Sequence, residues 1–333
     1  MKNILVGIDG SERSQRALEW AAALADREEG VTLTLLAIID PGSVRLAGSD
    51  EKILQTAVDN VLGTAQEHLT EKYPNLTVQV TVGRGDVVEA LIAAADDYDI
   101  VVLGSHHNKT VGEKVFGAKG LRVASAASVA TAVIPSDYAT DRCAKGIVVG
   151  VGPDDTSNDA VVLGVNMALA FDEPLELVSA WGIPTLISRT AEVMGGGLQP
   201  VGEMFQRKLD TLISQIKEAH PDIEVTGRAV EGASPAQVVM ECSEGKRMLL
   251  LGTHARSRVS RALFGSVTFG VLSRLEVPTI VVPERTLNNS CSKESDCKGQ
   301  LLVQLAFCFR KDSYLRRLYL ENPSIKARKS ISL

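Results

Sequence analysis

The sequence predicts an α/β protein made of two tandem open parallel five-stranded sheets with helices on both faces. Short apolar runs alternate with longer segments of helical periodicity, and such alternation requires parallel strands joined by right-handed crossovers. The same order of elements occurs twice: Gly7 and Gly104 correspond to Gly150 and Gly252, at offsets of 143 residues (7 to 150) and 148 residues (104 to 252). A tandem duplication therefore explains the pattern.

The first half opens with residues 4–8, a continuous apolar run typical of a central parallel strand that is covered on both faces. Ser11 and Ser14 offer helix caps, and the apolar residues that follow recur at helical spacing, which predicts a helix over 13–28. By the same criteria we expect strands at 31–40, 76–82, 99–104 and 129–135, and helices at 53–69, at 86–97 and from Gly117.

The second half repeats this order with small insertions. Strands are expected at 145–152, 174–181, 223–230, 247–252 and 277–282, and helices at 157–171, at 201–219, at 234–244 and from Gly265. Residues 182–200, with three consecutive glycines, interrupt the pattern as a long connection.

These patterns divide the 333 residues into two domains of ordinary size, at 1–138 and 146–284, joined by a linker at 139–145. Residues 285–333 depart from the repeat, and from 286 onward nine Lys or Arg face four Asp or Glu. We expect this basic tail to be a disordered appendage, and a membrane-surface or partner helix around 314–320 is the alternative.

Composition excludes several functional classes. A hydrophobic share of 45% with 23% charged residues is typical of a soluble globular protein, and a net charge of −6 argues against nucleic acid as a partner. The five cysteines form no CxxC pair and are odd in number, which favours reduced thiols over a disulfide framework or a zinc site. No apolar run approaches the length of a membrane span, so we expect a cytoplasmic protein.

Each half contains a strand that ends at a glycine, followed by a polar loop and a second glycine that opens a helix. The two pairs are Gly104 with Gly117 and Gly252 with Gly265. Backbone N–H groups at a helix N-terminus, together with the helix dipole, favour a bound phosphate. In open parallel sheets ligands bind at the carboxyl ends of the strands where the strand order reverses, so we expect the first and fourth strands of each half to be neighbours there.

At these residues the chain resembles the universal stress protein family in its tandem form, over roughly residues 1–284. The resemblance rests on ILVGIDGS (4–11), DIVVLGSH (99–106), MLLLGTH (248–254), and closing strands that end in VIP and VVP. It implies an adenine nucleotide alpha hydrolase-like, Rossmann-like fold and a non-catalytic, nucleotide-binding stress-response protein. It also implies that the fifth strands, at 130–134 and 278–282, pair with each other in an internal pseudo-dimer or in a homodimer.

In the ATP-binding branch of that family the phosphate loop is G-x2-G-x9-G-[ST], and an Asp ends the first strand. The first half keeps Asp9, Gly104 and Gly117, but has His107 for the second glycine and Ala118 for the hydroxyl residue.

The second half keeps Gly252, Gly265 and Ser266, but has Ala255 in the loop and Gly152 for the Asp. Since Ala adds only a methyl group while His adds an imidazole, the second loop is the less damaged. Arg256, Arg258 and Arg261 lie near enough in sequence to add positive charge.

The resemblance therefore implies ATP as ligand, with or without Mg²⁺, held mainly in the second half and weakly or not at all in the first. The positions beside the adenine are Ile38 and Ala180. The full set of predicted nucleotide-binding residues is Gly252, Gly265, Ser266, Val267, Leu251, Ala180, Gly150, Asp9, Gly104, Gly117 and Ile38.

Two other functional hypotheses remain open. The alternative is that the degenerate loops bind no nucleotide, and that the protein is a nucleotide-independent module that acts through dimerisation or partner binding. An enzyme is the weaker alternative, because the HIGH-type signature of related transferases is absent and Ser11 has no evident base, which makes it a helix cap rather than a nucleophile. His106 and His107 lack a carboxylate or Cys at metal-ligand spacing. Asp154 is either a displaced substitute for the missing Asp or the start of the next helix.

Overall fold

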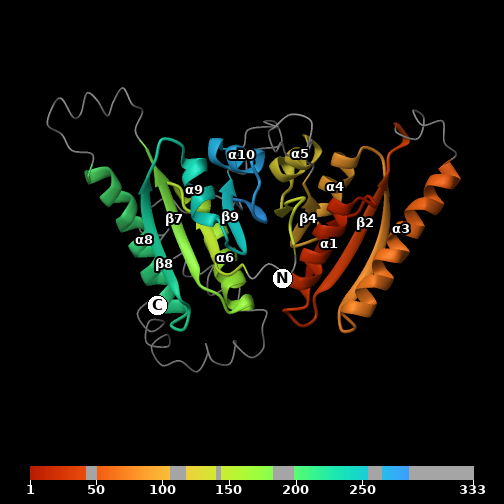
Figure 1. Ribbon diagram of the computed structural model, residues 1–333, viewed down its shortest axis with the longest axis horizontal. Helices are drawn as coiled ribbons and strands as arrows, with labels where there is room; N and C mark the ends of the chain where they lie inside the picture. The colour runs from red at the N-terminus through yellow and green to blue at the C-terminus, as the bar shows by residue number, and fades with distance from the viewer. Residues whose placement is uncertain (43–50, 106–117, 140–143, 183–198, 254–264, 285–333) are drawn as a thin grey trace, which may run out of the picture.

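The protein forms one continuous ten-stranded sheet rather than two separate ones (Figure 1). The computed structural model describes residues 1–42, 51–105, 118–139, 144–182, 199–253 and 265–284. The strand order across these residues is β3-β2-β1-β4-β5-β10-β9-β6-β7-β8. Within each half all neighbouring strands are parallel, which confirms the predicted fold class, but the two five-stranded sheets are joined edge to edge.

The first half follows the predicted order of elements. Its bounds are β1 Asn3–Gly7, α1 Glu12–Ala25, β2 Thr32–Ile39, α3 Glu51–Lys72, β3 Thr77–Arg84, α4 Val87–Ala95, β4 Ile100–Gly104, α5 Ala118–Ala126 and β5 Ala130–Ile134. Strand β1 is buried on both faces, as its continuous apolar run predicts. Gly117, the expected start of the fourth helix, lies outside the described residues.

The second half repeats this arrangement. Its bounds are β6 Ile147–Gly150, the 3₁₀ turn η1 Asp155–Ser157, α6 Asn158–Phe171, β7 Leu175–Trp181, α8 Gln199–Ala219, β8 Val225–Glu231, α9 Pro235–Ser243, β9 Met248–Thr253, α10 Ser266–Ser273 and β10 Thr279–Pro283. The helix expected from Ser157 begins one residue later, after the 3₁₀ turn. The Ser157 hydroxyl makes no capping bond to α6 and instead accepts a hydrogen bond from the Gly152 N–H at 3.3 Å.

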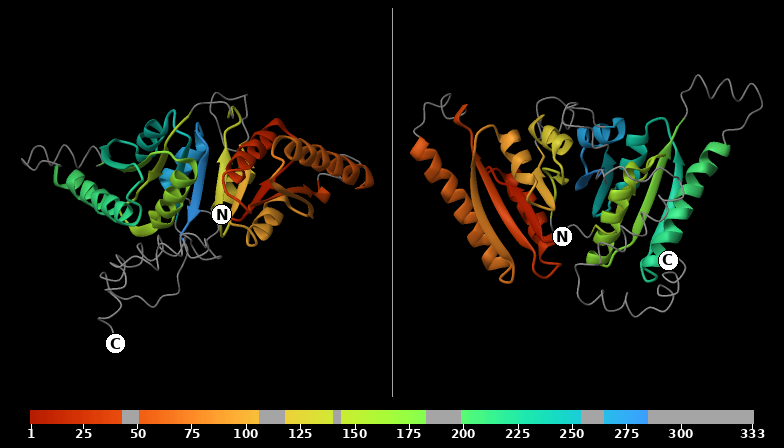
Figure 2. Two further views of the ribbon diagram at one scale, coloured as in Figure 1. Left: turned by 90° about the horizontal axis from the view of Figure 1, so that it is seen from below. Right: turned by 180° about the vertical axis from the view of Figure 1, so that it is seen from behind.

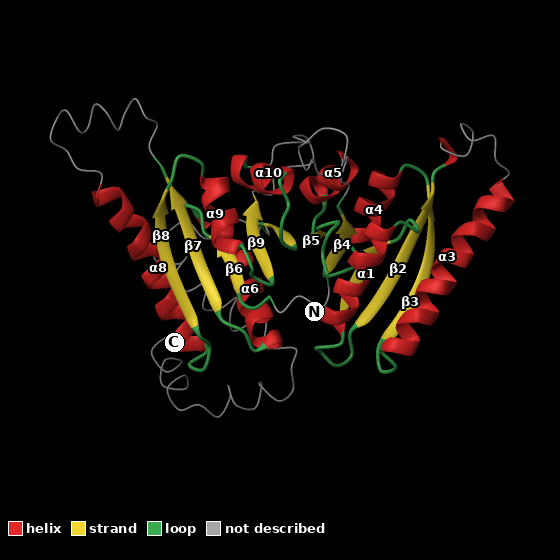
Figure 3. Ribbon diagram, in the orientation of Figure 1, coloured by secondary structure: helices red, strands yellow, loops and turns green. Residues whose placement is uncertain are grey.

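Helices cover both faces of the sheet (Figure 3). One hydrophobic core extends across both halves on the face covered by α1, α3, α6 and α8. On the opposite face α4 and α5 cover the first half, and α9 and α10 cover the second, each pair over a core of its own. In the described part of the chain no helix combines the length and the apolar character that crossing a membrane requires.

The halves meet at β5 and β10, which lie side by side at the centre of the sheet (Figure 2). The two strands pair antiparallel, with Thr279 opposite Val133 and Val281 opposite Thr131. All four residues are fully buried, and Ala124 of α5 and Leu272 of α10 join the same small core. This register confirms the internal pairing of fifth strands that the resemblance implies.

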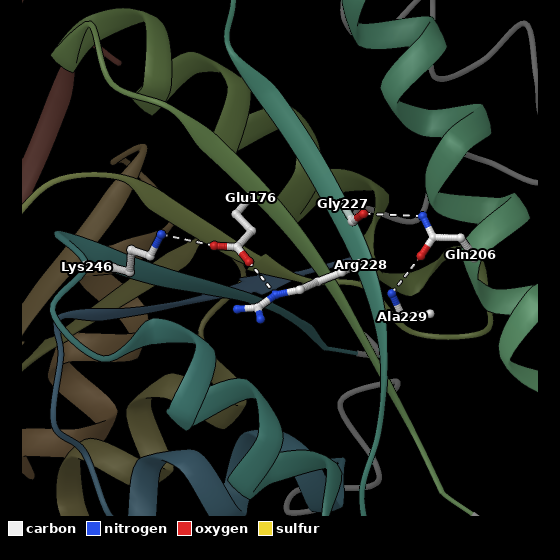
Figure 4. A network of polar contacts seen from close by, with 6 residues as sticks. All are labelled: Glu176, Gln206, Gly227, Arg228, Ala229 and Lys246. Carbon is white, nitrogen blue, oxygen red and sulfur yellow. Dashed lines mark hydrogen bonds and ion pairs between the residues drawn. The ribbon is translucent and has the colours of Figure 1, made fainter.

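The outer strand β8 is held by polar contacts of its neighbours (Figure 4). Gln206 of α8 donates from Nε2 to the Gly227 carbonyl at 3.3 Å, and its Oε1 accepts from the Ala229 N–H at 2.9 Å. Glu176 of β7 accepts from Arg228 Nε at 2.6 Å and from Lys246 Nζ at 3.0 Å. Since β8 has a strand partner on one side only, Gln206 supplies hydrogen-bonding partners at its open edge.

Glu19 of α1 is tied to α3 by His68 and Lys72. Its Oε1 lies 2.5 Å from His68 Nε2 and its Oε2 lies 2.6 Å from Lys72 Nζ. Burial alone would raise the pKa of Glu19, but the hydrogen bonds and charges of Lys72 and His68 outweigh it, so that the pKa lies below its ordinary value. The carboxylate is therefore more stable in the folded protein than in the unfolded chain.

We expect Glu19→Gln to destabilise the protein at neutral pH and much less in acid. A lowered folded-state pKa gives a stabilisation that is complete above the unfolded-state pKa and is lost as pH falls through the folded-state pKa. Urea unfolding at neutral pH and below pH about 4 should show the wild-type advantage shrinking. Glu29→Gln, an exposed control after α1, should show no such convergence, and a Glu19→Gln deficit that is equal at both pH values would contradict the assignment.

Candidate functional site

A cavity of about 650 Å³ opens at the carboxyl ends of β1 and β4 in the first half. Strand β1 pairs with β2 on one side and with β4 on the other, so the crossovers leave in opposite directions and a crevice remains between them. The same pairing of first and fourth strands occurs in the second half between β6 and β9. The prediction that the first and fourth strands are neighbours is therefore confirmed in both halves.

One wall of the cavity is apolar and is built by β2 and α3. It consists of Leu36, Ala37, Ile38, Leu54, Val58 and Val61. The α3 residues recur at helical spacing, so one stripe of that helix faces the cavity while the next stripe, with Leu62 and Leu69, enters the core. A flat aromatic base would be desolvated against such a wall, and the volume lies within the usual range of small-molecule sites.

The opposite side is polar, with Asp9 at its centre. Asp9 follows β1, and its Oδ1 accepts from the Ser11 N–H at 3.0 Å and from the Ser11 hydroxyl at 2.5 Å. Partial desolvation raises the pKa of Asp9, but the hydrogen bonds from Ser11, the Ser14 hydroxyl and the charge of Arg13 outweigh it and lower the pKa below its ordinary value. Asp9 is thus an ionised acceptor at neutral pH, and it suits a ribose hydroxyl or a cation.

Two basic residues border the same cavity. Arg13 lies in the first turn of α1, and Lys119 lies in the first turn of α5 and is exposed. Together with the N-terminal N–H groups of α1 and α5, they make this rim favourable for an anion. The cavity therefore combines an apolar wall, an ionised carboxylate and a positively charged rim.

The sequence motif did not indicate Arg13, Lys119 or the α3 wall. The only available signal was the helical spacing of Leu54, Val58 and Val61, which also fits an ordinary core stripe. Among the described residues no cluster of His, Cys, Asp and Glu is arranged to hold a metal ion, so Asp9 would need ligand oxygens to complete a Mg²⁺ site.

The two strand-ending glycines serve packing in this structure. A Cβ on Gly104 would lie 2.4 Å from the Arg13 carbonyl oxygen, and one on Gly252 would lie 2.3 Å from the Thr156 carbonyl oxygen. Gly is thus required because the first helix of each half, or the turn before it, approaches the end of the fourth strand. This reason differs from the phosphate contact that the motif suggests.

Three of the predicted binding residues line the first cavity: Asp9, Ile38 and Gly104. In the second half Gly265 is the N-cap residue of α10, with no capping side-chain bond, and Gly265 and Ser266 are exposed. Val267 and Ala180 are partly buried against the core of that half.

Leu251 and Gly150 belong to the sheet interior. Leu251 is fully buried, and a Cβ on Gly150 would lie 2.6 Å from Leu251 Cδ2. The other candidates, Gly117 and the loop residues His106, His107, His254, Ala255, Arg256, Arg258 and Arg261, lie outside the described residues.

The turn after β6 replaces Asp9 with Gly152 and contains its own polar contacts. Asp154 Oδ1 accepts from the Thr156 hydroxyl at 2.5 Å and from the Thr156 N–H at 3.3 Å. Lys208 of α8 donates from Nζ to the Gly152 carbonyl at 3.1 Å and to the Asp154 carbonyl. Asp154 thus closes the turn that leads into η1. This favours the interpretation that Asp154 starts the next helix over the one in which it substitutes for the missing Asp.

Comparison with known proteins gives a consistent result. The profile of the Universal stress protein family matches residues 1–135 and 144–283. A universal stress protein of Mycolicibacterium smegmatis is 25% identical over 299 residues, which covers 85% of this chain and 97% of that protein.

Solved structures agree on the fold. The crystal structure of a universal stress protein from Archaeoglobus fulgidus superposes with a TM-score of 0.59 at 17% identity, over 85% of this chain and 98% of that one. A putative universal stress protein from Pseudomonas aeruginosa gives a TM-score of 0.56 at 16% identity, over 92% and 98% of the two chains.

Proposed function

The chain belongs to the universal stress protein family, and on this premise we propose that it is a non-catalytic, cytoplasmic stress-response protein that binds an adenine nucleotide. The observation that carries the proposal is the cavity at the carboxyl ends of β1 and β4, with Asp9 on one side and Ile38 on the other. Adenine would lie against the apolar wall of β2 and α3, and the ribose hydroxyls would bond to the Asp9 carboxylate.

We place the principal site in the first half, although the sequence motif favours the second. The first half has the volume, the ionised carboxylate and the basic rim formed by Arg13 and Lys119. The second half retains Gly265 and Ser266 at the start of α10, where exposed N–H groups and a hydroxyl favour a phosphate. The site predicted in the second half therefore remains a competing site, and substitutions in each half can distinguish it from the site in the first half.

The hydrogen bonding of Ser11 supports the proposal of a binding role rather than hydrolysis. Its hydroxyl donates to Asp9, and the same oxygen accepts from the Ser14 N–H at 3.3 Å as the N-cap of α1. The lowered pKa of Asp9 makes its carboxylate a weak base for activating this hydroxyl as a nucleophile. Bound Mg²⁺, where ATP brings it, would share Asp9 and the phosphate oxygens and neutralise their charge.

We expect Asp9→Ala to weaken ATP binding by about tenfold or more, because a charged acceptor to the ribose is lost. Isothermal titration calorimetry of the full chain with ATP and Mg²⁺ measures this, and Asp97→Ala, which changes an exposed carboxylate after α4, should bind as the wild type does. Phosphate release should stay at the uncatalysed rate.

The companion variant Ser266→Ala tests the second-half site. A loss of affinity with Ser266→Ala and none with Asp9→Ala would place the nucleotide in the second half, as the motif predicts. Absence of any binding at millimolar ATP would remove the proposal and leave the alternative, a nucleotide-independent module that acts through dimerisation or partner binding.

A further inference from the structure

Lys208 of α8 reaches the turn that follows β6 at the carboxyl end of that strand. Its ammonium group donates to the main-chain carbonyls of Gly152, at 3.1 Å, and of Asp154. Both oxygens lie in the segment that leaves the carboxyl end of β6, where the first half has its cavity. The lysine therefore ties the long helix of the second half to the turn at the carboxyl end of β6.

The residue at the same position in the first half is Val61. The buried stripe of α3 (Leu62, Ala65, Leu69) corresponds to the buried stripe of α8 (Leu209, Leu212, Ile216) at a constant offset of 147 residues (62 to 209). The same offset pairs Val61 with Lys208. Contacts agree with this alignment, because a Cβ on Gly10, in the turn after β1, would lie 3.2 Å from Val61 Cγ2.

The two residues have opposite consequences for the crevice. Val61 is one of the apolar residues that line the 650 Å³ cavity. Lys208 is longer and charged, and its ammonium group donates to the Gly152 and Asp154 carbonyls of the turn after β6. The same offset places Phe205 where Val58 lines the first cavity, so two of these positions carry larger side chains in the second half.

The charges are also inverted. The first half presents the Asp9 carboxylate, whereas the second has Gly152 at that position and a lysine ammonium beside it. An adenosine that enters the second crevice would find no carboxylate at the position of Asp9, and it would have to displace charge-assisted hydrogen bonds of Lys208.

We infer that Lys208 closes the second crevice, so that one chain binds one adenine nucleotide, in its first half. This inference rests on the proposed function, because it states which of the two crevices is available to that ligand. Lys208 acts as a specificity-determining residue through the space and the carbonyl groups that it occupies.

Reciprocal substitutions test the inference by the stoichiometry of ATP binding. Calorimetry should give one site for the wild-type chain. Val61→Lys should weaken that site by about tenfold or more, while Val61→Met, which adds bulk without charge, should weaken it less. Lys208→Val should keep the first site and add a second, weaker one. Two sites in the wild type, wild-type binding by Val61→Lys, or a single site in Lys208→Val would each overturn the inference.

A readout without nucleotide keeps the inference separate from the proposed function. Removal of the ammonium in Lys208→Met should accelerate amide hydrogen exchange of residues 152–156 by about tenfold, the effect of losing hydrogen bonds from a charged donor. Lys217→Met, on the last turn of the same helix, is the matched control. Unchanged exchange in Lys208→Met would overturn the closure. If the wild type binds no ATP but this acceleration is seen, the proposed function fails, and with it the one-nucleotide stoichiometry, while the closure by Lys208 stands.

Discussion

Gly104→Ala is expected to destabilise the protein by about 3 kcal/mol, because one methyl group would overlap the backbone of α1. The added Cβ would lie 2.4 Å from the Arg13 carbonyl oxygen and 2.6 Å from the carbonyl carbon. Backbone atoms inside a helix cannot rotate away as a flexible side chain can, so α1 or β4 must move. The cost is a large part of the about 5–15 kcal/mol that stabilises an ordinary domain.

Urea unfolding measures this loss, and Gly63→Ala is its matched control. Gly63 lies within α3, and a Cβ there meets no atom within 4 Å. Since Ala is favoured over Gly inside a helix, Gly63→Ala should stabilise the protein by about 0.5–1 kcal/mol. Because Gly104 and Arg13 both line the cavity, Gly104→Ala should also weaken ATP binding. A stability within about 0.5 kcal/mol of wild type would contradict the close packing.

Phe171→Ala is expected to cost about 3 kcal/mol of stability and to loosen the contact between the halves. Phe171 ends α6 and is 9% exposed. The guanidinium carbon of Arg27, from the first half, lies 5.2 Å from its ring centroid, and that of Arg247, from the second half, lies 4.6 Å away. Glu173 fixes Arg247 by accepting from its Nε at 2.8 Å. The ring therefore links cations of both halves.

Phe171→Leu separates packing from the cation–π attraction. It keeps much of the buried volume but loses the aromatic face, so we expect a smaller cost, about 1 kcal/mol. Arg27→Ala should destabilise the wild type more than it destabilises Phe171→Ala. The difference between the two losses is the coupling energy that the double-mutant cycle measures. A Phe171→Leu variant as stable as the wild type would mean that the two cations add nothing.

The fold was predictable because its signals are local. The apolar run of β1, the helical spacing after it and the second occurrence of the same order define strands, helices and the duplication without tertiary information. The junction of the halves was predictable only through the resemblance, since nothing in the apolar sequence of β5 distinguishes pairing with β10 from any other buried pairing.

The site was predictable only in part, because its walls come from residues far apart in the sequence. Asp9 and Ile38 were found from the family motif, and the structure brings both to one cavity. Arg13, Lys119 and Val61 have no motif, and their positions depend on how α1, α5 and α3 pack. The hydrogen bonds of Lys208 to the turn after β6 are likewise a tertiary contact that spacing alone does not reveal.

The antiparallel register of β5 with β10 joins two similar halves within a single polypeptide. Their association is therefore intramolecular, and dilution does not separate them. A symmetric pair of identical chains must accept every substitution in both copies at once. A covalently joined pair is free of that constraint, so one half can keep Val61 while the other acquires Lys208, and unequal roles can evolve within one sheet.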